Sequence, residues 1–179
     1  MSEDISHIVG NASDKIKHFL VDRRKLFTAT GLAPDLEATF GDPVVAALKL
    51  SEISIYQNAM ESSSLEAKVT CKTRITQDMV NGGGNIHGGC CAFLIDVCSS
   101  GSIMALKISQ GVASFDVSQS LNVVYHAPAT IGENLRIVNT TMTVGRRVAS
   151  ARTEIWSETH HRLVASGVHI KMEPSPTKL

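Results

Sequence analysis

The residue of greatest chemical interest is Asp96, a lone carboxylate inside an apolar stretch. From Cys90 to Leu106 the chain consists mainly of Cys, Ala, Phe, Leu, Ile, Val and Met, interrupted by a few Ser and by Gly101. A helix that is apolar around its whole circumference is expected to be buried. Burying an unpaired carboxylate is costly, and perturbed carboxylates gather at functional sites. We therefore expect Asp96 to be buried and to take part in chemistry rather than to cap a neighbouring loop.

A glycine-rich loop and a histidine precede this helix. Residues 82–84 are three consecutive glycines, and His87-Gly88-Gly89 leads directly into the apolar stretch. A histidine between glycine-rich turns has little core to fill. We therefore expect a functional role for His87.

Composition excludes several classes of function. The 179 residues carry 17 basic and 17 acidic side chains, so the chain has no charge footprint for nucleic acid or for an anionic membrane surface. We expect that no stretch is long enough to span a membrane. The four cysteines show neither zinc-site spacing nor a disulfide framework, and we expect small core residues in a reducing compartment. We expect no metal and no cofactor.

The N-terminal third is predicted to be helical. Residues 13–30 carry an apolar stripe after Ser13, a possible N-cap, and a second, shorter helix starts at Asp42-Pro43 and runs through Leu48. We divide the chain into a helical extension (1–47), a main domain (48–173) and a flexible tail (174–179).

The rest of the chain alternates with the period of β-strands. Leu65 to Ile75 shows the clearest alternation of apolar and polar residues, which is typical of a strand with one wet face. The predicted strands cover residues 50–56, 65–75, 115–125, 134–144, 147–157 and 163–172. Two strands, one long helix and then four strands do not fit a parallel doubly wound sheet. We predict an α+β fold in which a curved antiparallel sheet wraps around the helix, with a partner chain covering the remainder.

This layout resembles the hotdog-fold acyl-CoA thioesterases, in particular the phenylacetate-type branch and its eukaryotic thioesterase superfamily members. The resemblance covers residues 48–172. The motifs that carry it are Asn81, His87-Gly88-Gly89, Asp96, the strand from Ser118 to Tyr125, and Gly167-x-His169-x-Lys171.

The resemblance implies catalytic roles for five residues. In this family two chains pair edge to edge, and each active site is built from both. Gly88 offers its backbone N–H to the thioester carbonyl oxygen, where the helix dipole favours negative charge. Asp96 of the facing subunit acts as general base on water or as nucleophile, and these alternatives stay open. Asn81 and His87 orient the carbonyl and the loop, and Ser118 helps to hold the water.

The resemblance also implies a coenzyme A site, in which positive groups meet the phosphates. Arg146 and Arg147 lie at a predicted turn, and His169 and Lys171 share one face of the last strand. The full set of expected substrate and coenzyme A contacts is Gly89, Ser120, Tyr125, Gly145, Arg146, Arg147, Val148, His169 and Lys171.

The function implied is hydrolysis of acyl-CoA thioesters to free carboxylic acid and coenzyme A. A hotdog hydratase or dehydratase is an alternative, but the spacing from His87-Gly88-Gly89 to Asp96 is the thioesterase arrangement. A non-catalytic acyl-CoA-binding protein is another, and mere binding does not need a buried acid. The identity of the acyl group stays open, although only 4% aromatic residues favour an aliphatic lining.

The last two expectations concern the oligomeric state of the protein and its location in the cell. The resemblance implies a homodimer or a dimer of dimers, hence a homotetramer, acting in lipid metabolism. We expect a cytoplasmic protein. The final Thr-Lys-Leu differs from a peroxisomal Ser-Lys-Leu signal only in its first residue, so peroxisomal import is a second possibility, and a mitochondrial location also stays open.

Overall fold

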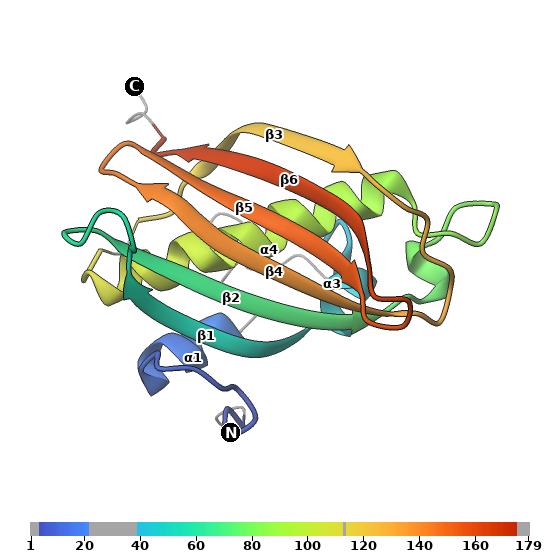
Figure 1. Cartoon of the computed structure of the whole chain (residues 1–179), viewed down its shortest axis with the longest axis horizontal. Coiled ribbons are helices and arrows are strands. Elements are labelled where there is room, and N and C mark those ends of the chain that lie inside the picture. The colour runs from blue at the N-terminus through green and yellow to red at the C-terminus, as the bar shows by residue number, and fades with distance from the viewer. Residues whose placement is uncertain (1–3, 22–38, 113, 175–179) are drawn as a thin grey trace.

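The computed structural model describes residues 4–21, 39–112 and 114–174. Within them, a six-stranded antiparallel sheet curves over one long helix (Figure 1). The strand order is β1-β2-β4-β5-β6-β3. The strands are β1 (Lys49–Gln57), β2 (Leu65–Arg74), β3 (Val117–Tyr125), β4 (Asn134–Val144), β5 (Val148–Ser157) and β6 (Arg162–Met172). This architecture is the predicted hotdog fold.

Helix α4 (Gly88–Ser109) lies in the concave side of the sheet (Figure 1). Its buried residues include Leu94, Ile95 and Leu106, each at most 1% exposed. Gly167 on β6 permits the close approach, because a Cβ there would lie 2.7 Å from the carbonyl oxygen of Asn122 and 3.1 Å from Ile95 Cγ2. The apolar sequence of α4 is therefore explained by packing against the sheet.

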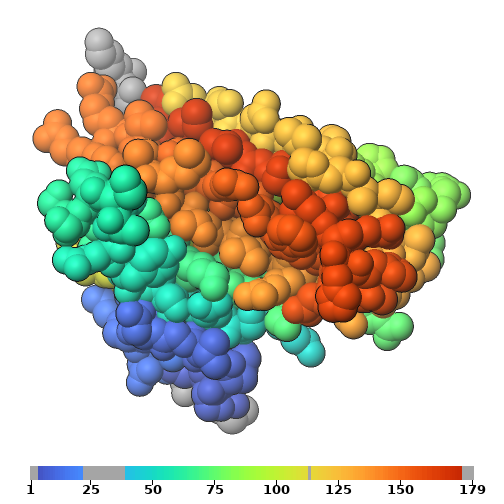
Figure 2. All heavy atoms as spheres, in the orientation of Figure 1, coloured from blue at the N-terminus to red at the C-terminus, as the bar shows by residue number. Residues whose placement is uncertain are grey.

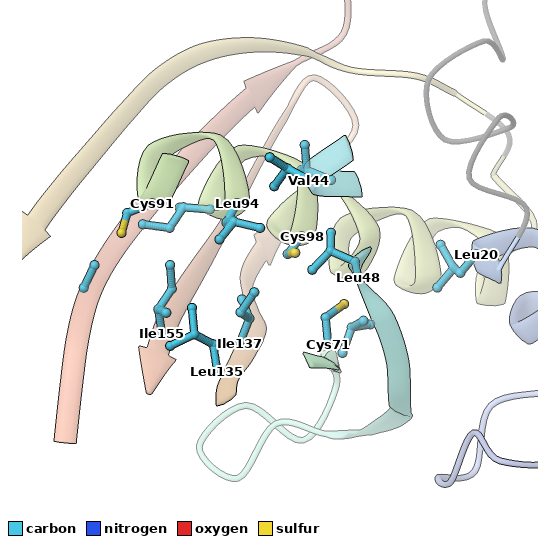
Figure 3. Close-up of a cluster of buried hydrophobic side chains, with 14 of the residues drawn as sticks. Leu20, Val44, Leu48, Cys71, Cys91, Leu94, Cys98, Leu135, Ile137 and Ile155 are labelled. Atoms are coloured by element: carbon cyan, nitrogen blue, oxygen red, sulfur yellow. The ribbon is translucent and has the colours of Figure 1, made fainter. Parts of the chain in front are cut away.

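The hydrophobic core draws on helices, strands and connecting segments alike. Figure 3 shows side chains from α1 (Asp14–Val21), α3 (Asp42–Ala47), α4 and the strands β2, β4 and β5 around this core. Ile16 and Leu20 of α1 are each 4% exposed, and Val44 of α3 is 7% exposed. The N-terminal helices thus bury the apolar residues of their predicted stripes.

The two edges of the sheet differ. On the β1 edge, the backbone of Val9 accepts a hydrogen bond from Ile53 N–H and donates one to the Ser51 carbonyl, both at 3.0 Å. The N-terminal segment therefore covers this edge, and Figure 2 shows it packed below β1. Strand β3 forms the other edge and is exposed along almost its entire length (Figure 2).

Several element boundaries differ from the predictions. Helix α1 starts at Asp14, and the Ser13 carbonyl accepts its first hydrogen bonds, but residues 22–30 of the predicted helix lie outside the described residues. Helix α3 ends one residue before Leu48. The single-turn 3-10 helix η1 (Gln77–Met79) was not predicted. Most of the predicted tail, residues 175–179, also lies outside the described part of the chain.

The expectation that no stretch is long enough to cross a membrane was wrong. With 22 residues and a mean hydropathy of 1.7 over its best window, α4 meets the criteria of length and composition. Within that window, however, 67% of the helix is buried inside the protein. Its apolar character therefore reflects a core helix.

Candidate active site

The N-terminus of α4 presents a backbone donor. His87 is the N-cap, and its Nδ1 accepts a hydrogen bond of 2.9 Å from Gly89 N–H. Gly88 N–H, at the first helical position, has no acceptor among the described residues. Because Nδ1 of His87 accepts, a neutral ring carries its proton on the exposed Nε2. The helix start thus offers two donors, Gly88 N–H and His87 Nε2–H, together with the positive end of the helix dipole, which favours an anionic group.

The loop before the helix is held by Asn81. Its Oδ1 accepts from Gly83 N–H at 2.9 Å and from Asn85 N–H at 3.3 Å, and its backbone pairs with Asn85. Gly84 closes this turn with a φ of 75°, a left-handed conformation that glycine adopts without strain. The structure therefore places Asn81 as the organiser of the loop that delivers His87.

Asp96 lies at the centre of a hydrogen-bonded cluster with Ser118 and His169. Ser118 Oγ lies 3.2 Å from Asp96 Oδ1 and 2.9 Å from His169 Nε2. His169 Nε2 is also 3.4 Å from Asp96 Oδ1, and its Nδ1 lies 2.7 Å from Ser99 Oγ. Helix α4 and strands β3 and β6 each contribute to this cluster.

The donation from Ser118 to Asp96 sets a direction for the other two bonds. The Ser118 hydroxyl has one hydrogen, and when it donates to Asp96 the Ser118 oxygen accepts from His169 Nε2–H. Nδ1 of His169 then carries no proton and accepts from the Ser99 hydroxyl. This neutral tautomer satisfies these three bonds, and the one hydrogen of the Ser99 hydroxyl then points to His169 Nδ1 at 2.7 Å and not to the Asp96 carbonyl at 3.1 Å. The Asp96 carboxylate is an acceptor only.

The surroundings keep His169 neutral. Its side chain is fully buried, and this burial lowers the pKa of the imidazole, with a further lowering from the positive charge of Lys171. The Asp96 carboxylate opposes that shift without reversing it.

Two lysines and their polar partners lie near Asp96. Lys171 Nζ donates to Ser100 Oγ at 2.9 Å, and Ser100 Oγ donates to the Asp96 carbonyl at 2.8 Å. Lys107 forms a buried ion pair with Asp116, with Nζ–O distances of 2.6 and 2.7 Å. These residues line a cavity of about 290 Å³ that also contains Asp96 and Ser118.

Asp96 is not buried, contrary to expectation. In the single chain its side chain is 41% exposed. It lies on the side of α4 that faces β3, the open edge of the sheet, where no further strand of the described chain covers it. The carboxylate is therefore available to a substrate or to a second chain.

The predicted coenzyme A contacts fall in two separate regions. The turn between β4 and β5 holds the exposed residues 145–148, and strand pairing puts it near Lys171 and the start of β3. Tyr125 lies at the other end of β3, where its hydroxyl donates to the Gly88 carbonyl at 3.1 Å. At about 3.4 Å per residue, roughly 24 Å of strand separates Ser118 from Tyr125. Within one chain, the predicted coenzyme A contacts therefore do not lie together in a single site.

His169 does not lie where the sequence led us to expect it. It was expected among the phosphate contacts, but it is fully buried between Ser99 and Ser118. The sequence did contain a signal for this placement. His169 shares the period-two face of β6 with Ala165 and Gly167, both buried against α4, and such small residues mark the side that faces a helix.

Cysteine is not the nucleophile of this site. Burial raises the pKa of the Cys90 thiol to about 11, and mainly burial raises that of Cys91 to about 12. Both thiols stay protonated at neutral pH, whereas thiolates are the reactive form.

Comparison with known proteins identifies the family. A sequence model described as "Thioesterase superfamily" matches residues 83–164, from the glycine-rich loop into β6. Mouse acyl-coenzyme A thioesterase 13 is 33% identical over 109 residues, which are 61% of this chain and 75% of the mouse protein. The chain belongs to the thioesterase superfamily.

Solved structures extend this likeness. Zebrafish thioesterase superfamily member 2 aligns with a TM-score of 0.64 at 26% identity, over 87% of this chain and 98% of the zebrafish protein. A hypothetical thioesterase from Streptococcus pneumoniae, solved with coenzyme A, aligns with a TM-score of 0.58 over 75% of this chain and 93% of its own. At 16% identity that likeness shows the fold alone.

Proposed function

We propose that this member of the thioesterase superfamily hydrolyses acyl-CoA thioesters to free carboxylic acid and coenzyme A, in a site shared by two chains. The observation that carries the proposal is that Asp96, a carboxylate bonded to the Ser118 hydroxyl, lies on the helix whose first N–H, that of Gly88, has no acceptor among the described residues. The names of the acyl-coenzyme A thioesterase 13 relatives support the substrate class.

Two chains are needed because of distance along α4. Gly88 and Asp96 are eight residues apart, which at 1.5 Å per residue is about 12 Å. A carbonyl oxygen bound at Gly88 therefore lies too far from Asp96 of the same chain for that carboxylate to deliver water to the carbonyl carbon. An antiparallel second copy brings its own Asp96 to this helix start.

The open edge of the sheet is the surface for that second copy. The outer edge of β3 has no neighbouring strand in the described chain and therefore offers its backbone groups for pairing. Val117, Val124 and Tyr125 on this strand are 49%, 48% and 58% exposed. Pairing of two β3 strands in a homodimer covers these side chains, and a dimer of dimers is the next level of assembly.

In this dimer, the groups at Gly88 of one chain and at Asp96 of the other act on the same thioester. Gly88 N–H and His87 Nε2–H stabilise negative charge on the thioester oxygen. Asp96 of the partner removes a proton from water, which Ser118 helps to hold, and the water oxygen bonds to the carbonyl carbon. The C–S bond breaks, coenzyme A leaves as its thiolate and takes up a proton. Direct attack by Asp96, followed by hydrolysis of the anhydride, uses the same groups.

The nucleotide end of coenzyme A is assigned to the turn between β4 and β5. Arg146 and Arg147 are exposed there, and guanidinium groups bind phosphate by paired hydrogen bonds. Ser120, Val148 and Lys171 lie at the same end of the sheet through their strand pairing.

The test is Asp96→Asn, assayed by release of free thiol from acyl-CoAs of graded length. The substitution keeps the volume but removes the base, so kcat should fall by about 10²–10⁴-fold. Glu158→Gln, at an exposed ion pair with Lys72, is the matched control and should keep wild-type turnover. Retention of more than half of the wild-type kcat in Asp96→Asn contradicts the proposal.

A further inference from the structure

Glu133 is a buried carboxylate that the proposed reaction does not use. It is 4% exposed and lies directly before β4, in the turn of residues 129–133. Its Oε1 accepts hydrogen bonds from the backbone N–H and the hydroxyl of Thr130, at 2.8 and 3.0 Å, and its Oε2 accepts from Ser157 Oγ at 2.6 Å. Ser157 is the last residue of β5, so the carboxylate ties the turn to the sheet.

The surroundings keep the Glu133 carboxylate ionised. Burial raises the pKa of this carboxyl, but the hydrogen bonds from Ser157 and Thr130 outweigh burial and hold the pKa below its usual range. Arg162 Nη2 and His160 Nε2 lie 3.5 and 3.7 Å from Oε1. An ionised carboxylate is a strong acceptor with room for several donors, so it serves all three bonds at once.

The turn anchored in this way pairs with the loop that delivers His87. Ile86 N–H donates to the Ala129 carbonyl at 2.7 Å, and Ile131 N–H donates to the Gly84 carbonyl at 3.1 Å. Both bonds belong to one short antiparallel pairing. Figure 1 shows the loop and the turn at the same end of the sheet, where β3 ends and β4 begins.

His87 directly follows this pairing, so its position depends on that of the turn. Its backbone N–H donates to the Met79 carbonyl at 2.8 Å, and the next residue, Gly88, begins α4. The loop is therefore held from two sides, by the turn and by the end of η1. Donors stabilise a developing negative charge only when they are fixed in place before the reaction.

We infer that Glu133 is a positioning residue for the two oxyanion donors, His87 Nε2–H and Gly88 N–H. The inference rests on the proposed thioester hydrolysis and names a further residue on which that reaction depends. The Glu133 side chain is buried, so it acts through the turn and its pairing with the loop rather than by contact with the substrate. Loosening the turn should therefore lower kcat and leave KM nearly unchanged.

The first test compares two substitutions of Glu133. Glu133→Ala should lower kcat by about ten-fold and change KM by less than about two-fold. Glu133→Gln should restore most of kcat, because its amide oxygen can accept from Thr130 and its amide N–H can donate to Ser157 Oγ. Equal losses of kcat in the Ala and Gln variants overturn the inference.

A matched control separates positioning from general loss of stability. Thr153→Val also removes a buried hydrogen bond, from Thr153 Oγ1 to Asn139 Oδ1 at 2.7 Å, but in the middle of the sheet. It should lower Tm and keep the wild-type kcat. If it lowers kcat as much as Glu133→Ala does, Glu133 contributes only to stability and the inference fails.

Amide hydrogen exchange tests the positional claim without any substrate. The Ile86 amide should exchange about ten-fold faster in Glu133→Ala than in the wild type, and at the wild-type rate in Thr153→Val. Ser157→Ala, which removes a single oxygen atom, guards against misfolding of the Glu133 variant. It should speed exchange at Ile86 and lower kcat, each by about three-fold. Unchanged exchange at Ile86 in both Glu133→Ala and Ser157→Ala contradicts the inference.

A double variant shows whether Glu133 acts through the loop. On a His87→Ala background, Glu133→Ala should lower kcat by less than about three-fold, because one of the donors it positions is already absent. A full, additive ten-fold loss argues against this route.

The same measurements distinguish failure of this inference from failure of the proposed function. If the wild type hydrolyses acyl-CoAs and Glu133→Ala matches it, the inference fails and thioester hydrolysis stands. If the wild type hydrolyses no acyl-CoA, the proposed function fails, whereas faster exchange at Ile86 in Glu133→Ala still supports control of the loop by Glu133.

Discussion

At the scale of single residues, His169 is best understood as a positioning residue for Ser118 and Asp96. It is fully buried, neutral, and donates to the oxygen of the hydroxyl that in turn donates to the carboxylate. It touches no substrate-facing surface itself. Its effect on the reaction therefore passes through the direction in which Ser118 points.

His169→Ala should lower kcat by roughly ten-fold at an unchanged KM, since a ten-fold effect corresponds to about 1.4 kcal/mol of lost hydrogen bonding. His169→Gln should restore most of kcat, because its amide can donate to Ser118 and accept from Ser99. Steady-state kinetics of both variants is the measurement. Equal losses in the Ala and Gln variants show that orientation of Ser118 is not what His169 contributes.

The lowered pKa of His169 also predicts how stability depends on pH. The unfolded chain binds a proton on His169 below about pH 6.5, whereas the folded chain resists protonation there. Unfolding is therefore favoured as the pH falls below about 6.5, down to the folded-state pKa. Tm measured between pH 7.5 and 5 should fall less steeply in His169→Gln than in the wild type. Parallel curves contradict a depressed pKa at this residue.

Sequence motifs predicted Asp96, Ser118, His87 and Gly88 as site residues, and the structure brings the first two within hydrogen-bond distance. The burial of Asp96 was wrong because hydropathy reports the composition of a helix and not which flank the sheet leaves open. The place of His169 depends on packing between β6 and α4, a tertiary contact that the motif alone does not contain.

At the scale of elements, α4 is anchored to the segment before β3 by the ion pair between Lys107 and Asp116. Both side chains are under 5% exposed, and Lys107 Nζ also donates to Ser114 Oγ at 3.0 Å. This anchor fixes the start of β3, and therefore Ser118, relative to Asp96 on α4.

Lys107→Met should destabilise the fold by about 3–5 kcal/mol, because Asp116 is left charged, buried and unpaired. The double variant Lys107→Met with Asp116→Asn removes both charges and should recover much of that loss. Urea unfolding of the full chain measures both values. A loss below about 1 kcal/mol in the single variant shows that the pair behaves as a surface ion pair.

Most helices and strands were predictable from the periodicity of apolar residues along the sequence. The exposure of β3 was not, and the reason is its position in the sheet. The predicted strand over residues 134–144 agrees with β4 at both ends, because its buried and polar positions alternate against the core. Strand β3 alternates in sequence as well, yet it is exposed almost throughout, because its neighbours lie on one edge only. The proposed pairing of two β3 strands accounts for this exposure, since a second chain would then cover the strand.

At the scale of the whole molecule, the two edges of the sheet differ in what covers them. The N-terminal segment covers β1 within the chain, whereas β3 stays open beside Asp96. The central claim is that a functional site combines the helix start of one chain with the carboxylate of another. The separation of about 12 Å between Gly88 and Asp96 along α4 is the reason for this proposal.

Mixed dimers test this claim most directly. One chain carries Asp96→Asn and the other carries Gly88→Pro, which removes the first helical N–H at a position where helices tolerate proline. His87 already has the extended backbone that precedes proline, with φ of −69° and ψ of 136°. Each variant alone should be inactive, and the two should be co-expressed with different tags.

In the mixed dimer one site combines both substitutions and the other has neither. Random assembly of equal amounts should therefore recover about a quarter of the wild-type activity per chain, since half of the dimers are mixed and each has one intact site. Purified mixed dimers should reach about half. If the mixture stays as inactive as either variant alone, the helix start and the carboxylate act within one chain, and the shared site is wrong.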